Sequence, residues 1–270
     1  ERVIEAALND DIGSGDITTN SIIPLGAEAN AKIIAKENGI FAGLFVAEAV
    51  FKKLDTDIEW NSLVSDGSFV ENMTTIAEVN GSLRTILTGE RTALNFLQRM
   101  SGIATQTKKF VDIIRNTKTK ILDTRKTAPG LRKLDKYSVS CGGGTNHRTG
   151  LYDMILIKDN HIKAAGSITN AVAEARKYIQ PGMKIEVETT DYLQIREALT
   201  LNVDIIMLDN MTPPQMKIAV EMIDGKCLTE ASGNINLINV RQVAETGVDM
   251  ISVGALTHSA KALDISLEII

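Results

Sequence analysis

The chain has 270 residues, enough for one large domain or two small ones, and 44% of them are hydrophobic, so we expect a sizeable core. Its formal net charge of −5 argues against nucleic acid as a partner, because phosphate contacts need a basic face. The apolar run at 39–51 is too short to cross a membrane, Glu48 interrupts it, and the first residues lack a signal-peptide pattern. Cys141 and Cys227 lack metal-ligand spacing and are expected as reduced thiols. We therefore expect a cytoplasmic protein without a membrane partner.

The first hundred residues predict a small sheet with helices. Alternating apolar residues indicate strands, and apolar residues at helical spacing indicate helices. Thr88 is a candidate cap for a helix that ends at Met100. The expected elements are a helix over 2–8, strands within 29–43 and 71–87, and helices over 44–54, 88–100 and about 104–115.

The rest of the chain follows a different pattern, in which short β-branched runs end in a polar residue and precede a helical segment. The later units repeat about every 20 to 25 residues, the size of a βα unit, which predicts a parallel sheet, either open or closed as a barrel. The expected strands are KILDT (120–124), MILIKD (154–159), KIEVET (184–189), DIIMLDN (204–210), CLTEASG (227–233) and MISVGA (250–255), with a seventh around 144–148. The expected helices lie over 171–179, 191–201, 214–223 and 235–247.

We favour a barrel over an open sheet. No GxGxxG fingerprint follows a strand, and each run places its polar residue at the carboxyl end, where barrel active sites lie. If the strands are neighbours, these residues all face the mouth of the barrel, which is the opening at the carboxyl ends of its strands. The strand-end residues are Arg125, Lys126, His147, Arg148, Lys158, Glu188, Asp209, Glu230, Ser232, Gly233 and Gly254.

The basic strand-end residues belong to a local cationic island. Residues 123–163 contain eight Lys or Arg and four Asp, a balance of 8 − 4 = +4, whereas the whole chain is 29 − 34 = −5. Arg binds carboxylates through two parallel hydrogen bonds, and Lys acts as a point charge. A single strand-end Arg is more often a solvated surface charge, but five basic groups at consecutive strand ends favour a pocket for a small polyanion.

The acidic and small residues suggest the other parts of a ligand site. Glu188 and Asp209 could hold hydrated Mg²⁺ or sugar hydroxyls, although each could equally cap the following helix. Ser232, Gly233 and Gly254 are typical of a phosphate cradle built from backbone N–H groups, or of tight turns. His147 is a candidate proton carrier or donor to substrate.

The chain resembles the quinolinate phosphoribosyltransferase family, also called nicotinate-nucleotide pyrophosphorylase (carboxylating). The resemblance covers most of residues 88–260 and also DDIGSGDITT near the start. One departure is Asn234, where many members have glycine and where a side chain could crowd the phosphate loop. The matching segments are GERTALNFLQRMSGIAT, DTRKTAPGLRKLDKYSV, CGGGTNHRTGL, LIKDNHI, IEVE, IMLDN, EASGNI and GVDMISVGALTHS.

This resemblance implies an α/β protein with an N-terminal α/β sandwich over 1–102 and an incomplete parallel α/β barrel of six to seven strands over 103–270, whose last helix would pack back on the N-terminal domain. It implies an enzyme, a pentosyltransferase, that joins quinolinate to 5-phosphoribosyl-1-pyrophosphate. The products would be nicotinate mononucleotide, pyrophosphate and CO₂, in de novo NAD biosynthesis with Mg²⁺. Dimers or larger assemblies would place each site at a subunit interface.

The resemblance also assigns roles to residues. Lys126, Lys158, Glu188 and Asp209 would be catalytic, and Glu188 and Asp209 would hold the metal through water. Quinolinate would bind Arg125, Lys126, His147, Arg148 and Lys158, with Arg91 lent by the partner subunit. The phosphoribosyl donor would bind Thr124, Lys158, Glu188, Asp209, Ser232, Gly233, Gly254 and His258.

Two rival functions stay open from the sequence. Lys158, at a strand end, could form a Schiff base with a carbonyl substrate, as in a barrel lyase. A relative of this family with a different anionic acceptor, associated with molybdenum uptake, would keep the fold. Loss of the arginine set would favour that relative, and the set is present.

Overall fold

The structure is a computed structural model that describes residues 1–270. The chain divides into two compact units, the first with a four-stranded and a two-stranded sheet and the second with a six-stranded sheet. The first unit comprises residues 1–108, 128–143 and 259–270, and the second comprises 109–127 and 144–258.

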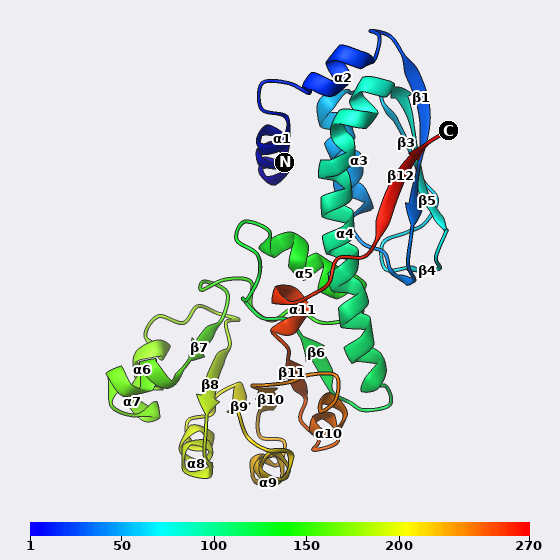
Figure 1. Ribbon diagram of the computed structural model, residues 1–270. Coiled ribbons are helices and arrows are strands. Elements are labelled where there is room, and N and C mark those ends of the chain that lie inside the picture. Colours follow the sequence, from blue (N-terminus) through cyan, green and yellow to red (C-terminus); the bar gives the residue numbers. More distant parts are fainter. The chain divides into compact units, whose positions relative to one another are not determined.

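The first unit contains a four-stranded antiparallel sheet in the order β12-β1-β5-β3, together with helices α1 to α5 (Figure 1). Its core gathers Phe41, Phe51, Ile76 and Leu97, all fully buried. The strands within 29–43 and 71–87 and the helix over 44–54 are confirmed. The elements are α1 (Arg2–Ile12), α2 (Ile17–Ile22), β1 (Glu28–Ala35), β2 (Gly39–Ile40), α3 (Leu44–Leu54), β3 (Glu59–Ser62), β4 (Phe69–Val70), β5 (Thr75–Ser82), α4 (Leu83–Ile113), α5 (Arg132–Cys141) and β12 (Ile265–Ile269).

Two expectations for this unit were wrong. The helices expected over 88–100 and 104–115 are one helix, α4, and Thr88 lies inside it, donating a hydrogen bond to Asp16. Gly102 lies inside this helix, where a side chain would collide with the backbone of Lys261. The expected C-terminal helix is the strand β12, whose β-branched residues pair antiparallel with β1.

The second unit is an incomplete α/β barrel. Its six strands are parallel, in the order β6-β11-β10-β9-β8-β7, and helices follow most of them (Figure 1). All six strands expected from the sequence are confirmed. The elements are β6 (Lys120–Leu122), β7 (Ile155–Ile157), α6 (Asp159–Ala165), α7 (Ile168–Arg176), β8 (Ile185–Thr189), α8 (Tyr192–Thr200), β9 (Ile205–Asp209), α9 (Pro213–Ile223), β10 (Leu228–Ser232), α10 (Val240–Ala244), β11 (Met250–Ser252) and α11 (Ala255–His258).

Two elements of this unit differ locally from the expected ones, because side chains accept hydrogen bonds from the backbone there. The seventh strand expected around 144–148 is reduced to one parallel bridge between Leu122 and Thr145, and the N–H of His147 donates to the Asp123 carboxylate instead of a ladder. Helix α10 starts later than expected because the side chains of Asn236 and Asn239 accept hydrogen bonds from the loop backbone.

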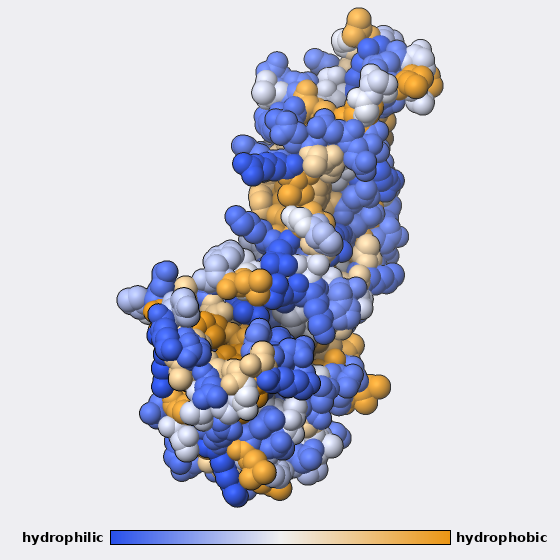
Figure 2. Space-filling view, turned by 90° about the vertical axis from the view of Figure 1, so that its left-hand side faces the viewer, coloured by the Kyte–Doolittle hydropathy of each residue, from blue (hydrophilic) through white to orange (hydrophobic).

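None of the helices has the length and apolar character needed to cross a membrane. The face drawn in Figure 2 is mostly hydrophilic, and its apolar residues form separate patches.

Candidate active site

Strand register places the acidic residues of the second unit on one face of the sheet. Glu188 pairs with Met207, which pairs with Glu230, and Asp209 pairs with Ser232. Paired residues of parallel strands share a face, and so do residues two apart along a strand. The buried Val187, Leu208 and Ala231 take the opposite face. The polar side chains therefore converge on the concave side, towards the carboxyl ends.

The cationic part of the site contains Arg125, which follows β6, and Arg148. The Nε of Arg125 is buried and has no hydrogen-bond partner. Arg148 donates through Nη1 to the carbonyl of Met154, 3.2 Å away. Burial and the charge of Arg125 both lower the pKa of Arg148. An anion that bound between these guanidinium groups would relieve that unfavourable proximity and satisfy the Arg125 donor.

Lys158 and Glu188 form an ion pair at the mouth, with 2.8 Å between Nζ and Oε2. The pair joins the end of β7 to the neighbouring strand β8. The backbone N–H of Lys158 donates to Nδ1 of His161, so His161 supports this turn. Asp209, at the end of β9, accepts a hydrogen bond from the amide of Asn210.

The loops after β10 and β11 approach their neighbours too closely for larger residues. At Gly233, whose φ is 98°, a Cβ would stand 2.2 Å from Oδ1 of Asn210. Asn234 also adopts a left-handed backbone, with φ 53°, and its amide donates to that same oxygen, 3.1 Å away. Asn210 therefore holds the Asn234 side chain beside the loop.

Gly254 brings residues of the early and late loops together. A Cβ there would stand 3.0 Å from Cδ of Lys126 and 3.2 Å from Nε2 of His258. The hydroxyl of Thr257 donates to the Lys126 carbonyl, and Thr124 Oγ1 accepts from the Lys126 N–H. Lys126, Thr124, Gly254 and His258 thus form one side of the mouth.

His147 lies deeper, against two buried carboxylates. Its Nε2 is 3.0 Å from Oε2 of Glu186 and 3.3 Å from Oε2 of Glu230, and the side chains are 9%, 0% and 0% exposed respectively. Burial alone would lower the pKa of His147, but contact with Glu186 and Glu230 outweighs it and raises the pKa to about 10. Burial and the charge of Glu230 raise the pKa of Glu186.

Two groups of acidic residues could hold a cation. The ligand atoms of His147, Glu186 and Glu230 all lie within 4.8 Å of one another. The charge of Arg148 acts on Glu186 from beside this group and opposes a divalent ion there. Glu188 and Asp209 point to the same concave side and lie further along the strands. They are the better pair for Mg²⁺, which typically takes one or two carboxylates plus substrate phosphates.

The second unit contains every predicted site residue except Arg91. Arg91 is exposed on α4, in the first unit. Sequence reasoning missed Asp123 and Glu186 and gave Glu230 no role. The alternation in IEVET was a usable signal, because it places Glu186 on the same face as Glu188.

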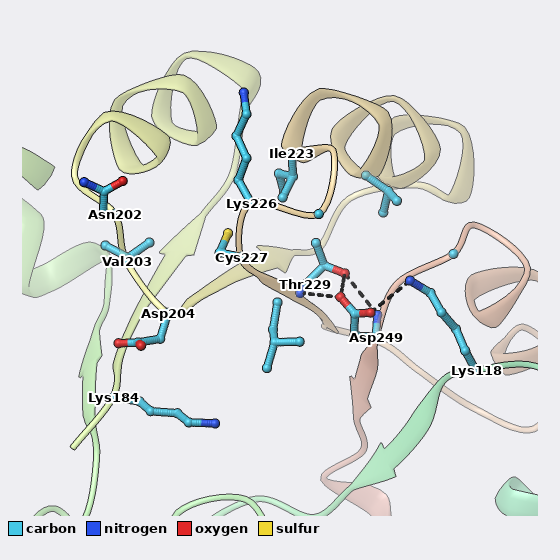
Figure 3. Close-up of a pocket in the computed structure, with 14 residues that line it drawn as sticks. Lys118, Lys184, Asn202, Val203, Asp204, Ile223, Lys226, Cys227, Thr229 and Asp249 are labelled. Atoms are coloured by element: carbon cyan, nitrogen blue, oxygen red, sulfur yellow. Dashed lines mark hydrogen bonds and ion pairs between the residues drawn. The ribbon is translucent and has the colours of Figure 1, made fainter. Parts of the chain in front are cut away.

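A second hollow, of about 550 Å³, lies at the opposite, amino ends of the strands (Figure 3). Its lining includes Lys184, Lys226 and Cys227. Figure 3 shows Asp249 between Thr229 and Lys118, and its carboxylate accepts hydrogen bonds from the Thr229 N–H and hydroxyl and from Lys118 Nζ. These contacts tie β10 and β11 to the segment before β6.

Replacing this carboxylate should destabilise the second unit. We expect Asp249→Asn to lower the free energy of unfolding by about 1–3 kcal/mol at pH 7. Burial alone would raise the pKa of Asp249, but hydrogen bonds from Lys118 and Thr229 lower it. The contribution is therefore present above the unfolded pKa of about 4 and is lost as the pH falls through the lower folded-state pKa.

Urea unfolding at pH 7 and pH 3 measures this effect. The difference between Asp249→Asn and the parent should shrink at pH 3, and Lys226→Ala, on an exposed residue of the same hollow, should stay within about 0.5 kcal/mol of the parent. Equal stability of Asp249→Asn and the parent at pH 7 would contradict the assignment.

Two family models match the chain. The quinolinate phosphoribosyl transferase N-terminal domain matches residues 16–101, and the C-terminal domain of the same family matches residues 103–268.

Relatives and solved structures agree with these models. The mitochondrial quinolinate phosphoribosyltransferase [decarboxylating] 2b of Nicotiana tabacum is 45% identical over 288 residues, covering 100% of this chain and 82% of that protein. The probable nicotinate-nucleotide pyrophosphorylase [carboxylating] of Synechocystis is 44% identical, covering 97% and 90%. The solved nicotinate-nucleotide pyrophosphorylase of Francisella tularensis is 44% identical with a TM-score of 0.96, covering 100% and 95%.

Proposed function

The chain belongs to the quinolinate phosphoribosyltransferase family, and we propose that it transfers the phosphoribosyl group of 5-phosphoribosyl-1-pyrophosphate to quinolinate with loss of CO₂. The product, nicotinate mononucleotide, serves NAD biosynthesis. The observation that carries this proposal on the chain itself is the buried, unpartnered Nε donor of Arg125 near a second guanidinium. The protein has a net charge of −5, yet residues 123–163, which contain both arginines, have a surplus of basic residues.

Arg125, His147 and Arg148 bind the two quinolinate carboxylates, and Lys126 and Lys158 add positive charge. A dianion suits this set, because the two guanidinium groups lie near one another. Arg91 completes the pocket from the partner subunit of a homodimer or larger assembly, so the site needs self-association.

The phosphoribosyl donor binds beside the acceptor, against Thr124, Ser232, Gly233, Gly254 and His258. As pyrophosphate leaves C1, positive charge builds on the ribose ring, and the carboxylates of Glu188 and Asp209 stabilise it. The same two carboxylates fit Mg²⁺ through water, and the ion would neutralise charge on the leaving pyrophosphate. Lys158, paired with Glu188, lies between donor and acceptor.

The ring nitrogen of quinolinate bonds to C1, and the adjacent carboxylate then leaves as CO₂. The electron pair left on the ring carbon is stabilised by the quaternised nitrogen and by the surrounding cations. A proton from Lys126 or from a bound water completes the product.

A cytoplasmic location stays a prediction, and both cysteines are free thiols.

The rival functions have less support. The Nζ of Lys158 is paired with Glu188, 2.8 Å away, whereas a Schiff-base enzyme needs that amine free to attack a carbonyl substrate. A relative that uses another anionic acceptor would not need the complete arginine set.

Release of CO₂ from carboxyl-labelled quinolinate tests the proposal. We expect release that requires 5-phosphoribosyl-1-pyrophosphate and Mg²⁺, with nicotinate inert as the control acceptor. A folded protein that binds the donor but releases no CO₂ would contradict the assigned acceptor.

A further inference from the structure

Three buried carboxylate oxygens of the second unit lack hydrogen-bond partners: Oε1 of Glu186 and both oxygens of Glu230. Both side chains are fully buried, and they come from β8 and β10, which are separated by β9. Leaving a buried carboxylate ionised and unpaired is costly, so a pair that stays ionised needs a compensating positive charge. The His147 ring lies between both, with its Nε2 near one oxygen of each.

Hydrogen bonds hold both the backbone and the ring of His147. Its backbone N–H donates to Asp123 Oδ1, 2.8 Å away, which anchors the residue to the end of β6. Its Nε2 donates to Glu186 Oε2 and lies within ion-pair distance of Glu230 Oε2. A neutral ring could satisfy one carboxylate through Nε2–H, but it would leave Glu230 without any opposing charge.

We propose that Glu186 and Glu230 are positioning residues that hold His147 as a buried imidazolium, so that its charge is a permanent part of the acceptor-binding pocket. The inference rests on the proposed function for the identity of the acceptor. The raised pKa of His147 agrees with the geometry. The other charged groups that face this cluster are Asp123 after β6 and Arg148 beside the ring.

This arrangement explains why two buried acidic residues, Glu186 and Glu230, lie next to a proposed site for an anion. Arg125, Arg148 and a charged His147 would repel one another if they stood alone, and the buried carboxylates offset part of that repulsion without competing for the ligand at the mouth. Because the carboxylates contact the ring and not the mouth, they act on the acceptor through His147.

NMR of the ¹⁵N-histidine-labelled full chain tests the charge directly and without substrate. The protein has three histidines, and loss of signals in His147→Gln identifies the ring of interest. We expect ring nitrogen shifts typical of imidazolium up to pH 8.5 in the parent. In Glu230→Gln, the ring should titrate near the ordinary histidine value of about 6.5. A neutral His147 in the parent at pH 7.5, or signals that move on adding Zn²⁺, would overturn the proposal.

Kinetics test the consequence for the acceptor. In Glu230→Gln the KM for quinolinate should be close to that of the parent at pH 6 and about tenfold higher at pH 8.5, where the ring is neutral. The KM for the phosphoribosyl donor should not follow pH in this way. Glu174→Gln, which alters an exposed ion pair on α7, is the matched control and should behave as the parent.

A purely structural role would raise KM equally at both pH values, and that result would overturn the proposal. Glu186→Gln provides a second variant if Glu230→Gln does not fold. Absence of turnover in every protein, the parent included, would count against the proposed function, while the NMR titration of the parent would still decide the charge of His147.

Discussion

Arg148→Ala should lower kcat/KM for quinolinate by roughly 30- to 3,000-fold. This range is the usual cost of removing one partner from a buried charge pair, here the proposed pair of Arg148 with a quinolinate carboxylate. Arg148 is partly buried and lies near Arg125, so water can replace its guanidinium only poorly. The affinity for 5-phosphoribosyl-1-pyrophosphate, measured by calorimetry, should change less than about threefold, because the proposed site for that ligand lies mainly at the loops after β10 and β11.

The control for this variant is Arg196→Ala, on an exposed face of α8, which should retain parental kinetics. An Arg148→Lys variant keeps the charge but loses the paired geometry, and it should fall between the two. Near-normal use of quinolinate by Arg148→Ala would remove the basis for the acceptor pocket.

Glu188→Gln should lower kcat by roughly 100- to 1,000-fold, the usual cost of losing one preorganised charge that stabilises a transition state. The change keeps the size of the side chain but removes the charge that pairs with Lys158 and that suits Mg²⁺. The KM for quinolinate should not rise, because the mouth becomes more positive.

Steady-state kinetics over a range of Mg²⁺ concentrations measure this prediction. Glu188→Gln should need more Mg²⁺ than the parent for half-maximal rate, whereas Glu221→Gln, on an exposed residue of α9, should need the same amount. A kcat within twofold of the parent would contradict the role of Glu188.

Much of the second unit could be predicted from the sequence, because the residue pattern of each segment favours the same element that packing in the sheet stabilises. Each β-branched run that ends in a polar residue became a parallel strand, from KILDT to MISVGA. The strand-end residues converge because parallel strands present their carboxyl ends to one edge, so Arg125, Lys158 and Asp209 could be grouped without coordinates.

The missed features depend on contacts between distant residues. Gly102 lies inside α4, and a glycine is needed there because a chain segment some 160 residues later packs against it, which no local rule predicts. The strand β12 forms because β1 offers it a free edge. In the sequence, Glu186 and Glu230 look like ordinary strand residues. Their contact with His147, which comes from another segment, is visible only in the structure.

The most direct test of the account is a crystal structure of the protein with quinolinate. The account predicts both carboxylates of quinolinate at the carboxyl ends of the barrel strands, with Arg125 Nε donating to one of them and with Arg148 and His147 within hydrogen-bond distance. Quinolinate bound in the hollow at the amino ends of the strands, or bound without contact to Arg125 and Arg148, would contradict it.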